Sequence, residues 1–222
     1  MQRVAEEVYH IPLMPRDGIN CYLVEGTLVD SGIRASYGKI SRCLRQVPAH
    51  RHVLTHAHAD HQGSSDQLCQ TFNLPLDCHE REVLRTETGL VTKDYPSPGS
   101  PIAKFQQACW AGQGHPVADT LRENDWVGTF RVVESPGHAA GHLAFFREKD
   151  GLLLAGDVAT NMNLLTTWPG LHLPPAMFTS NQEQNIASLK KLADLHPRLI
   201  CFGHGPVLLN DQRQFEHFAA RQ

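Results

Sequence analysis

The chain has 222 residues, of which 41% are hydrophobic, and this predicts a single domain with a full hydrophobic core. The formal net charge is −3, with acidic and basic residues mixed along the chain, so neither nucleic acid nor an anionic membrane is expected as a partner. No apolar run approaches the ~18 residues of a membrane span, no signal peptide is recognised, and the scattered cysteines fit reduced thiols, so we expect a cytoplasmic protein.

Short strands and helices alternate in the first third of the chain. Gly26 separates two β-type segments as a tight hairpin would. The apolar segment 52–54 is predicted to be a short strand that leads directly into a histidine-rich motif. We expect strands at 4–10, 20–25, 27–30, 52–54 and 76–79, and helices at 35–46 and 64–72.

The segment 88–116 differs from its surroundings because it holds four prolines and four glycines. We interpret it as irregular chain around one helix at 102–110. Long irregular segments in compact domains tend to be lids or binding loops. The predicted organisation is therefore one domain over residues 1–222, with a lid-like insertion at about 88–116.

Strands return in the second half of the chain, on either side of a second Pro-rich stretch at 161–179. Ser180 stands three residues before Glu183, which is the spacing of a capping box at the start of a helix. We expect strands at 130–134, 142–147, 151–155 and 198–202, a helix after Ser180, and a closing helix at 211–220. This alternation, with many β-type segments, predicts an α/β sandwich of sheets covered by helices.

The motif THAHADHQG, residues 55–63, places three histidines and an aspartate within six residues. His56 and His58 stand two residues apart, so in extended backbone their side chains point the same way, and Asp60 and His61 follow in the turn beyond. Three further side chains also stand just past apolar strands, in glycine turns: His138, Asp157 and His204. We expect the seven to converge, because open α/β sheets commonly bind ligands beyond their strand ends.

Histidine and aspartate are metal ligands, and the number of candidates indicates how many ions they suit. A single tetrahedral zinc ion takes three or four protein ligands. Seven candidates therefore suit two ions, which can share a carboxylate and a hydroxide. Asp157 is the candidate for the shared carboxylate.

Each candidate also has a plainer interpretation. The histidine cluster alone could be a polar turn at a helix start, and His138, Asp157 and His204 could be ordinary turn residues. His142 competes with His138, but it begins a strand and lacks the preceding Ser-Pro-Gly turn. Asp30 could have only a structural role in the turn where it lies. Five side chains could line a substrate pocket or equally pack in the core: Tyr95, Trp110, Met162, Trp168 and Phe178.

The seven candidates resemble the signature of the metallo-β-lactamase superfamily, which is HxHxDH followed by separate His, Asp and His residues. The glycine settings SPGH, AGD and FGHG and the early VDSG element at 29–32 also match, and the resemblance covers nearly the whole chain. It implies a four-layer αββα sandwich with metal ions at one edge. The ligand sets it implies are His56, His58 and His138 for one zinc ion and Asp60, His61 and His204 for a second, with Asp157 between them and Asp30 beside the ligands.

The resemblance also implies a hydrolase of the glyoxalase II type. Two zinc ions, with iron or manganese as alternatives, lower the pKa of bound water. The hydroxide between them would attack the carbonyl of a thioester, ester or lactone, and Asp60 would orient it and carry a proton. The expected partner is therefore a small-molecule acyl substrate.

Several departures separate the chain from known members. The β-lactamases lack the bridging aspartate, so Asp157 disfavours β-lactam hydrolysis. Hydroxyacylglutathione hydrolases carry a C-terminal helical extension, whereas 18 residues follow His204 here. Acyl-homoserine lactonases often have a tyrosine soon after the bridging aspartate, and residues 158–162 contain none, which weakens but does not remove that alternative.

Two further alternatives stay open. One is a persulfide dioxygenase of the same superfamily, with a single iron ion on His56, His138 and Asp157. The other is a non-catalytic zinc-binding protein, for which an Asp60→Ala variant would fold and function unchanged. The identity of the metal separates the hydrolase from the dioxygenase.

Overall fold

The computed structural model describes residues 1–222 and contains two large sheets. The first sheet has seven strands in chain order: β1 (Gln2–Ala5), β2 (Val8–Pro12), β3 (Asn20–Val24), β4 (Thr27–Val29), β5 (Arg51–Val53), β6 (Leu76–His79) and β7 (Asp119–Leu121). Strands β1 to β4 pair antiparallel, and β4 to β7 pair in parallel. The parallel half places the carboxyl ends of β4, β5 and β6 at a common edge.

The second sheet has six strands in the order β15-β14-β11-β10-β9-β8. Its members are β8 (Trp126–Val127), β9 (Phe130–Glu134), β10 (Leu143–Arg147), β11 (Leu152–Gly156), β14 (Leu199–Phe202) and β15 (Leu208–Leu209). Strands β11 and β14 are parallel neighbours, so the loops that follow them leave from the same edge. A separate hairpin is formed by β12 (Thr160–Met162) and β13 (Pro169–His172).

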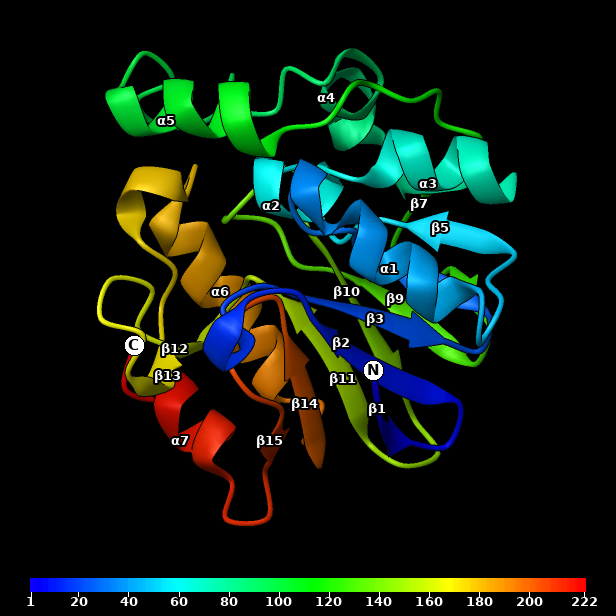
Figure 1. The fold of residues 1–222 in the computed structure, drawn as a ribbon. Helices are drawn as coiled ribbons and strands as arrows, with labels where there is room; N and C mark the ends of the chain where they lie inside the picture. Colours follow the sequence, from blue (N-terminus) through cyan, green and yellow to red (C-terminus); the bar gives the residue numbers. More distant parts are fainter.

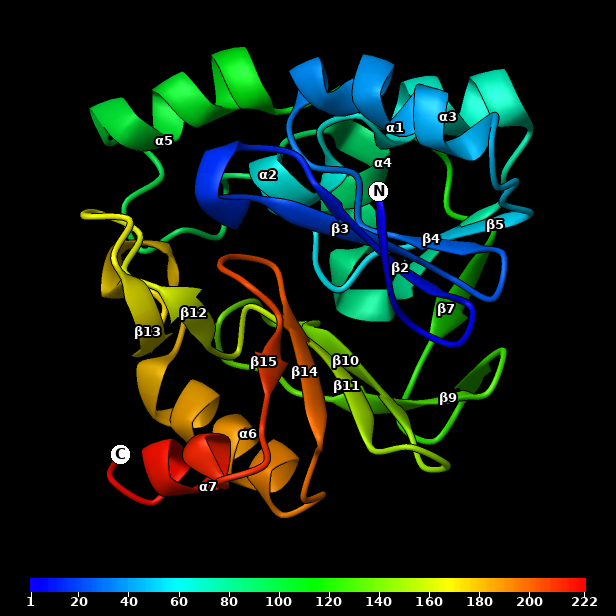
Figure 2. The same ribbon diagram turned by 60° about the horizontal axis from the view of Figure 1, so that its bottom comes forward.

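Helices cover the outer faces of both sheets (Figures 1 and 2). The α-helices are α1 (Tyr37–Leu44), α2 (Ala59–Gln62), α3 (Ser65–Phe72), α4 (Val83–Thr88), α5 (Pro101–Phe105), α6 (Gln182–Ala193) and α7 (Gln214–Ala219). Shorter turns are the 3-10 helices η1 (Pro15–Asp17), η2 (Arg34–Ser36), η3 (Glu80–Glu82) and η5 (Ala176–Phe178), and the π-helix η4 (Gln106–Trp110). None of these helices combines the length and apolar composition needed to cross a bilayer.

Three hydrophobic clusters separate four layers. The first packs α1 and α3 on the seven-stranded sheet through residues such as Ile40 and Leu68. The second lies between the sheets and includes Val53 and Phe145. The third packs α6 and α7 on the six-stranded sheet, with Leu189 at its centre. The predicted four-layer αββα sandwich is therefore confirmed.

Most predicted elements are present, and three expectations need correction. The strand expected at 4–10 is the two strands β1 and β2, because the chain reverses at Glu7, which has a φ of 52°. The cap of α6 is Asn181, whose side chain accepts a hydrogen bond from the amide of Gln184, so Ser180 lies outside the helix. Third, the sequence did not predict strands β7, β8, β12, β13 and β15 or helices α2 and α4, because such short elements carry little periodicity.

The segment 88–116 contains α5 and η4, which together match the helix expected at 102–110. The stretch 161–179 contains the β12–β13 hairpin and η5. All six cysteines are free, and five are buried, whereas Cys109 is exposed.

Candidate metal centre

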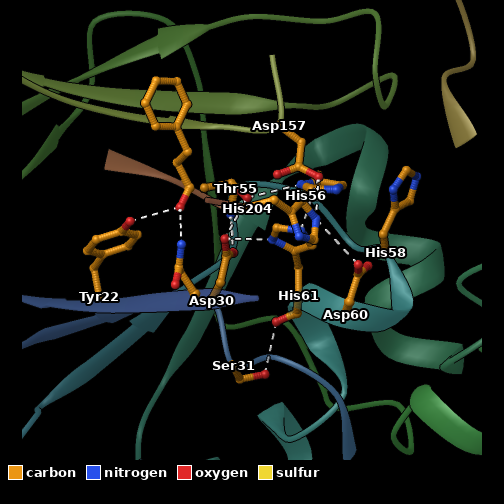
Figure 3. A network of polar contacts seen from close by, with 12 residues as sticks. Tyr22, Asp30, Ser31, Thr55, His56, His58, Asp60, His61, Asp157 and His204 are labelled. Atoms are coloured by element: carbon orange, nitrogen blue, oxygen red, sulfur yellow. Dashed lines mark hydrogen bonds and ion pairs between the residues drawn. The ribbon is translucent and has the colours of Figure 1, made fainter. Parts of the chain in front are cut away.

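The seven predicted ligands lie together in one cluster. Figure 3 shows this cluster from close by, with the ligands other than His138 labelled. His56 and His58 lie in the loop after β5, and the short helix α2 carries the next two ligands. The other three follow β9, β11 and β14: His138, Asp157 and His204. Six of the seven side chains are almost fully buried, and that of Asp60 is 14% exposed. The structure therefore brings every predicted ligand into one cluster.

The cluster divides into two half-sites. The three-histidine half-site consists of His56, His58 and His138, and the mixed half-site consists of Asp60, His61 and His204. Within each, the ligand atoms lie within 4.8 Å of one another. Ligands at ~2.0–2.1 Å from one tetrahedral zinc ion are about 3.4 Å apart, so each half-site has the dimensions of one ion.

Asp157 lies between the half-sites. Its Oδ2 is 3.0 Å from Nε2 of His204 and 3.4 Å from Nε2 of His61, both in the mixed half-site. The same oxygen is 3.7 Å from Nε2 of His138 in the three-histidine half-site. One carboxylate oxygen thus faces imidazoles of both half-sites, which is the position of a shared ligand.

Four of the five ligand histidines point Nε2 into the cluster because Nδ1 is engaged elsewhere. The acceptors of Nδ1 are Thr55 Oγ1 for His56 (3.0 Å), Asp30 Oδ2 for His61 (2.9 Å), Thr179 Oγ1 for His138 (3.1 Å) and Gly18 O for His204 (2.6 Å). His58 is the exception, since its Nδ1 faces the cluster at 3.0 Å from His138 Nε2. Hydrogen bonds at the outer nitrogen fix the tautomer and the ring orientation of metal-ligating histidines.

Asp30 holds two of the loops together. Its Oδ1 accepts from the Thr55 amide at 2.8 Å, and its Oδ2 accepts from the Thr55 hydroxyl at 2.8 Å and from His61 Nδ1. The residue has a φ of 60°, in the left-handed region that is sparsely occupied by residues other than glycine. Such backbone persists where the surroundings over-determine it, commonly at functional sites.

Buried atoms without partners test whether the residues fit metal ions. Among the buried side-chain atoms without a hydrogen-bond partner are Nε2 of His56, Nε2 of His61 and Oδ1 of Asp157. Buried polar atoms are nearly always paired, so each such atom requires an explanation. All three belong to the ligand cluster, and the donor set of imidazoles and carboxylates suits zinc and iron. The residues therefore fit the ions that the resemblance implies.

Protonation differs between the half-sites. Burial lowers the pKa of His138 to about 3 and holds the pKa values of His56 and His58 well below the ordinary value. Burial also opposes the charged forms of His61 and His204, but two carboxylates together outweigh it: Asp157 and Asp30 beside His61, and Asp157 and Asp60 beside His204. The pKa of His204 is raised to about 9 and that of His61 is raised well above the ordinary value.

Gly203 shows why glycine stands next to these ligands. A Cβ atom at this position would lie 2.1 Å from Asp157 Oδ1 and 2.7 Å from His61 Cε1. Only glycine leaves room for the two ligands to approach the loop after β14. The first glycine of the FGHG motif is therefore required by the close packing of these two side chains.

His142, the competitor of His138, lies beside the cluster rather than in it. Its Nε2 accepts a hydrogen bond from the amide of Asp157 at 2.9 Å, and its Nδ1 lies 2.8 Å from Ser135 Oγ. It therefore orients Asp157 through the backbone amide of that residue. Its position four residues after His138 marks it in the sequence as a competing ligand, but not as a partner of the Asp157 amide.

A cavity of about 670 Å³ opens onto the cluster. Both Pro-rich stretches line it: Tyr95, Ile102, Phe105, Gln106 and Trp110 from the first, and Met162, Leu164, Leu165, Thr167, Pro175 and Phe178 from the second. Its floor includes Asp60 and Asp157. Of the five side chains weighed for a pocket, Trp168 does not line this cavity and is 74% exposed.

Comparison with known proteins identifies related chains. The sequence model of the metallo-beta-lactamase superfamily matches residues 14–204. The uncharacterized protein YobT of Bacillus subtilis (strain 168) is 32% identical over 206 residues, which cover 86% of this chain and 84% of YobT. The probable metallo-hydrolase YflN of the same organism is 29% identical over 205 residues, covering 80% of this chain and 74% of YflN.

More distant similarities add a named activity and a solved structure. The thioesterase pkgB of Emericella nidulans is 30% identical over 212 residues, which cover 91% of this chain and 50% of pkgB. The crystal structure of TTHA1623 in a di-iron-bound form aligns with a TM-score of 0.69 at 25% identity, covering 90% of this chain and 94% of that chain.

Proposed function

The chain belongs to the metallo-beta-lactamase superfamily, and from this premise we propose that it is a dinuclear metal-dependent hydrolase of thioesters or small esters. The observation that carries the proposal is the position of Asp157 Oδ2, which faces imidazoles of both half-sites. A single ion would use the ligands of only one half-site. The names of YflN and pkgB, a probable metallo-hydrolase and a thioesterase, support the reaction class.

Two divalent ions, zinc or iron, would supply a water of lowered pKa and a positive charge for the substrate carbonyl oxygen. Asp60 is placed to handle the proton of that water, because its carboxylate lines the cavity and its Oδ2 lies 3.5 Å from His204 Nε2. It would accept the proton as the water attacks and return it to the departing thiolate or alkoxide. The products are a carboxylate and a thiol or alcohol.

The cavity walls favour an acyl substrate. Besides the ligands, the residues that line the cavity include one charged side chain, Arg16, which donates to Thr167 Oγ1 at 2.7 Å across the mouth. The remaining wall is largely apolar or uncharged, which excludes water from the reacting carbonyl and suits a small organic ligand. In this proposal residues 88–116 form a lid over the single domain and 161–179 form the facing wall.

The test is hydrolysis by protein that carries its full complement of metal. Thioesters, oxygen esters and lactones with the same acyl group are compared, with Asp60→Asn as the catalytic variant and Asp66→Asn, on α3 outside the cluster, as the matched control. We expect thioester turnover that Asp60→Asn lowers by about 10²-fold or more and the control leaves unchanged. Absence of turnover of every acyl substrate by fully loaded protein contradicts the proposal.

A further inference from the structure

Glu82 links the two loops that carry the three-histidine half-site. It ends η3, directly before α4, and its side chain is fully buried. Its Oε2 accepts a hydrogen bond from the amide of Ala57 at 2.9 Å, and its Oε1 accepts one from the amide of Gly141 at 2.8 Å. The two amides belong to loops that leave different sheets, one after β5 and the other between β9 and β10.

These two amides lie next to the ligands. Ala57 stands between His56 and His58, and Gly141 lies three residues after His138 in the same turn. No backbone carbonyl accepts a hydrogen bond from either amide, so Glu82 is the acceptor of both. The carboxylate therefore sets the distance between the two loops at the point where they present their imidazoles.

The fit around Gly141 is close. A Cβ atom on this residue would lie 2.9 Å from Glu82 Oε1 and 2.8 Å from His79 Nδ1. The turn after His138 is thus packed directly on the carboxylate, and glycine is the residue that permits this approach.

A buried charge needs a partner, and Arg85 supplies it. Its guanidinium donates to Glu82 Oε2 through one nitrogen and pairs with Asp94 through another. Asp94 precedes Tyr95, whose ring contacts that of His58 with a centroid distance of 4.8 Å. The network therefore continues from the ligand loops into the segment that walls the cavity.

The two histidines of the mixed half-site are held by hydrogen bonds outside this network. His61 is held by Asp30, and His204 is held by the carbonyl of Gly18. We therefore expect a change at Glu82 to act mainly on the three-histidine half-site, because the hydrogen bonds that hold His61 and His204 stay in place.

We propose that Glu82 is a positioning residue that fixes the spacing of His58 and His138, and so tunes metal binding at the three-histidine half-site. The inference rests on the metal centre of the proposed function. It does not depend on which acyl compound is the substrate.

The test compares stepwise Zn²⁺ affinities, measured by competition with a chromophoric chelator, in wild type, Glu82→Gln and Glu80→Gln. Glutamine keeps the shape of the side chain but turns one acceptor into a donor facing an amide. We expect Glu82→Gln to weaken one ion by about 10- to 100-fold, the usual range for partners of metal ligands, and to change the other less than about twofold. The exposed Glu80 in the same turn serves as the control and should change neither affinity.

Visible absorption of Co²⁺-loaded protein identifies the affected half-site, with His138→Ala and His204→Ala as references for loss of each ion. The altered bands of Glu82→Gln should match those lost in His138→Ala. If both affinities are unchanged, or both fall equally, or the bands match His204→Ala, the inference is wrong. If Glu82→Gln does not fold, Gly141→Ala is measured instead, because its added methyl group would displace the same carboxylate. It must then weaken the same ion selectively.

The affinities are measured without substrate, so they separate two failures. Wild type that binds two ions but hydrolyses no acyl compound contradicts the proposed function alone. If wild type and Glu82→Gln both bind two ions with the same high affinity, this inference alone is contradicted.

Discussion

The two half-sites of the metal centre each offer three side chains, yet they differ in charge and in the protons they hold. His56, His58 and His138 are imidazoles whose pKa values are lowered by burial, so they are neutral at pH 7. In the mixed half-site, by contrast, His61 and His204 have raised pKa values because Asp157 lies against them.

This difference indicates two modes of metal binding. An ion that enters the three-histidine half-site meets lone pairs that are already free. An ion that enters the mixed half-site must displace protons, because ligand imidazoles are neutral when they bind metal. In this account, the protons on His61 and His204 compete with the second ion for the mixed half-site.

The largest expected effect comes from the residue that the half-sites share. Asp157→Asn removes the negative charge between them while preserving the size of the side chain. We expect hydrolysis to fall on the order of 10³-fold or more and the metal content to fall below two ions per chain. Steady-state kinetics and elemental analysis measure both, and a variant that retains two ions and wild-type activity would refute a shared ligand.

Removing one ligand from each half-site separates their contributions. His138→Ala should lose the ion of the three-histidine half-site and His204→Ala that of the mixed half-site, each leaving about one ion, with activity lowered on the order of 10²-fold or more. Metal content and Co²⁺ spectra distinguish the remaining ions. Identical spectra for the two variants would mean that the half-sites are not independent.

A buried histidine beneath the mixed half-site affects stability. His52 Nδ1 donates to Leu28 O, and its Nε2 accepts from the Ser65 hydroxyl, which lies 2.9 Å from Ser31 Oγ. The Ser31 amide donates to His61 O at 2.7 Å. Burial lowers the pKa of His52 to about 4, so the folded state favours its neutral form.

Protons bind more readily to His52 in the unfolded chain, and stability is therefore lost as the pH falls from 6.5 to about 4. We expect this residue to account for up to about 3 kcal/mol of the loss in free energy of unfolding. Denaturant titrations of metal-free wild type and His52→Asn at pH 7 and pH 4.5 measure it. The variant should lose less stability on acidification, and equal losses would show that His52 is not neutral in the fold.

The pH dependence of metal binding tests the difference between the half-sites directly. With the pKa of His204 at about 9 and that of His61 also raised, the metal affinity of the mixed half-site should fall at least about tenfold for each pH unit from 9 towards 7. The raised pKa also stabilises the metal-free fold below pH 6.5, and this contribution is lost as the pH rises through 9. Calorimetry in buffers of different ionisation enthalpy should detect proton release for one of the two ions. Equal proton release by both ions would remove the distinction.

The sandwich of sheets and the position of the cluster were predictable because the signals are local, whereas the four-layer order came from the resemblance. His138, Asp157 and His204 each follow an apolar strand and stand beside a glycine. The loop after β14 gives the reason, since Gly203 packs against Asp157 and His61. The cap of α6 was misplaced by one residue because Ser180 and Asn181 are both good cap residues. The reversal at Glu7 had no glycine or proline to mark it.

The supporting residues were harder to find. Glu82 acts on backbone amides of Ala57 and Gly141, which are 84 residues apart and meet only when the two sheets pack. Nothing in the local sequence indicates such a contact. His142 was visible as a candidate ligand, but its bond to the amide of Asp157 depends on the pairing of β10 and β11.

The most direct test of the two-ion account is the metal content of the protein purified without chelators, by elemental analysis. The account predicts about two divalent ions per chain, zinc or iron, with thioester hydrolysis that disappears when they are removed and returns when they are restored. A single tightly held iron ion per chain, with oxygen uptake on a persulfide and no acyl hydrolysis, would contradict it.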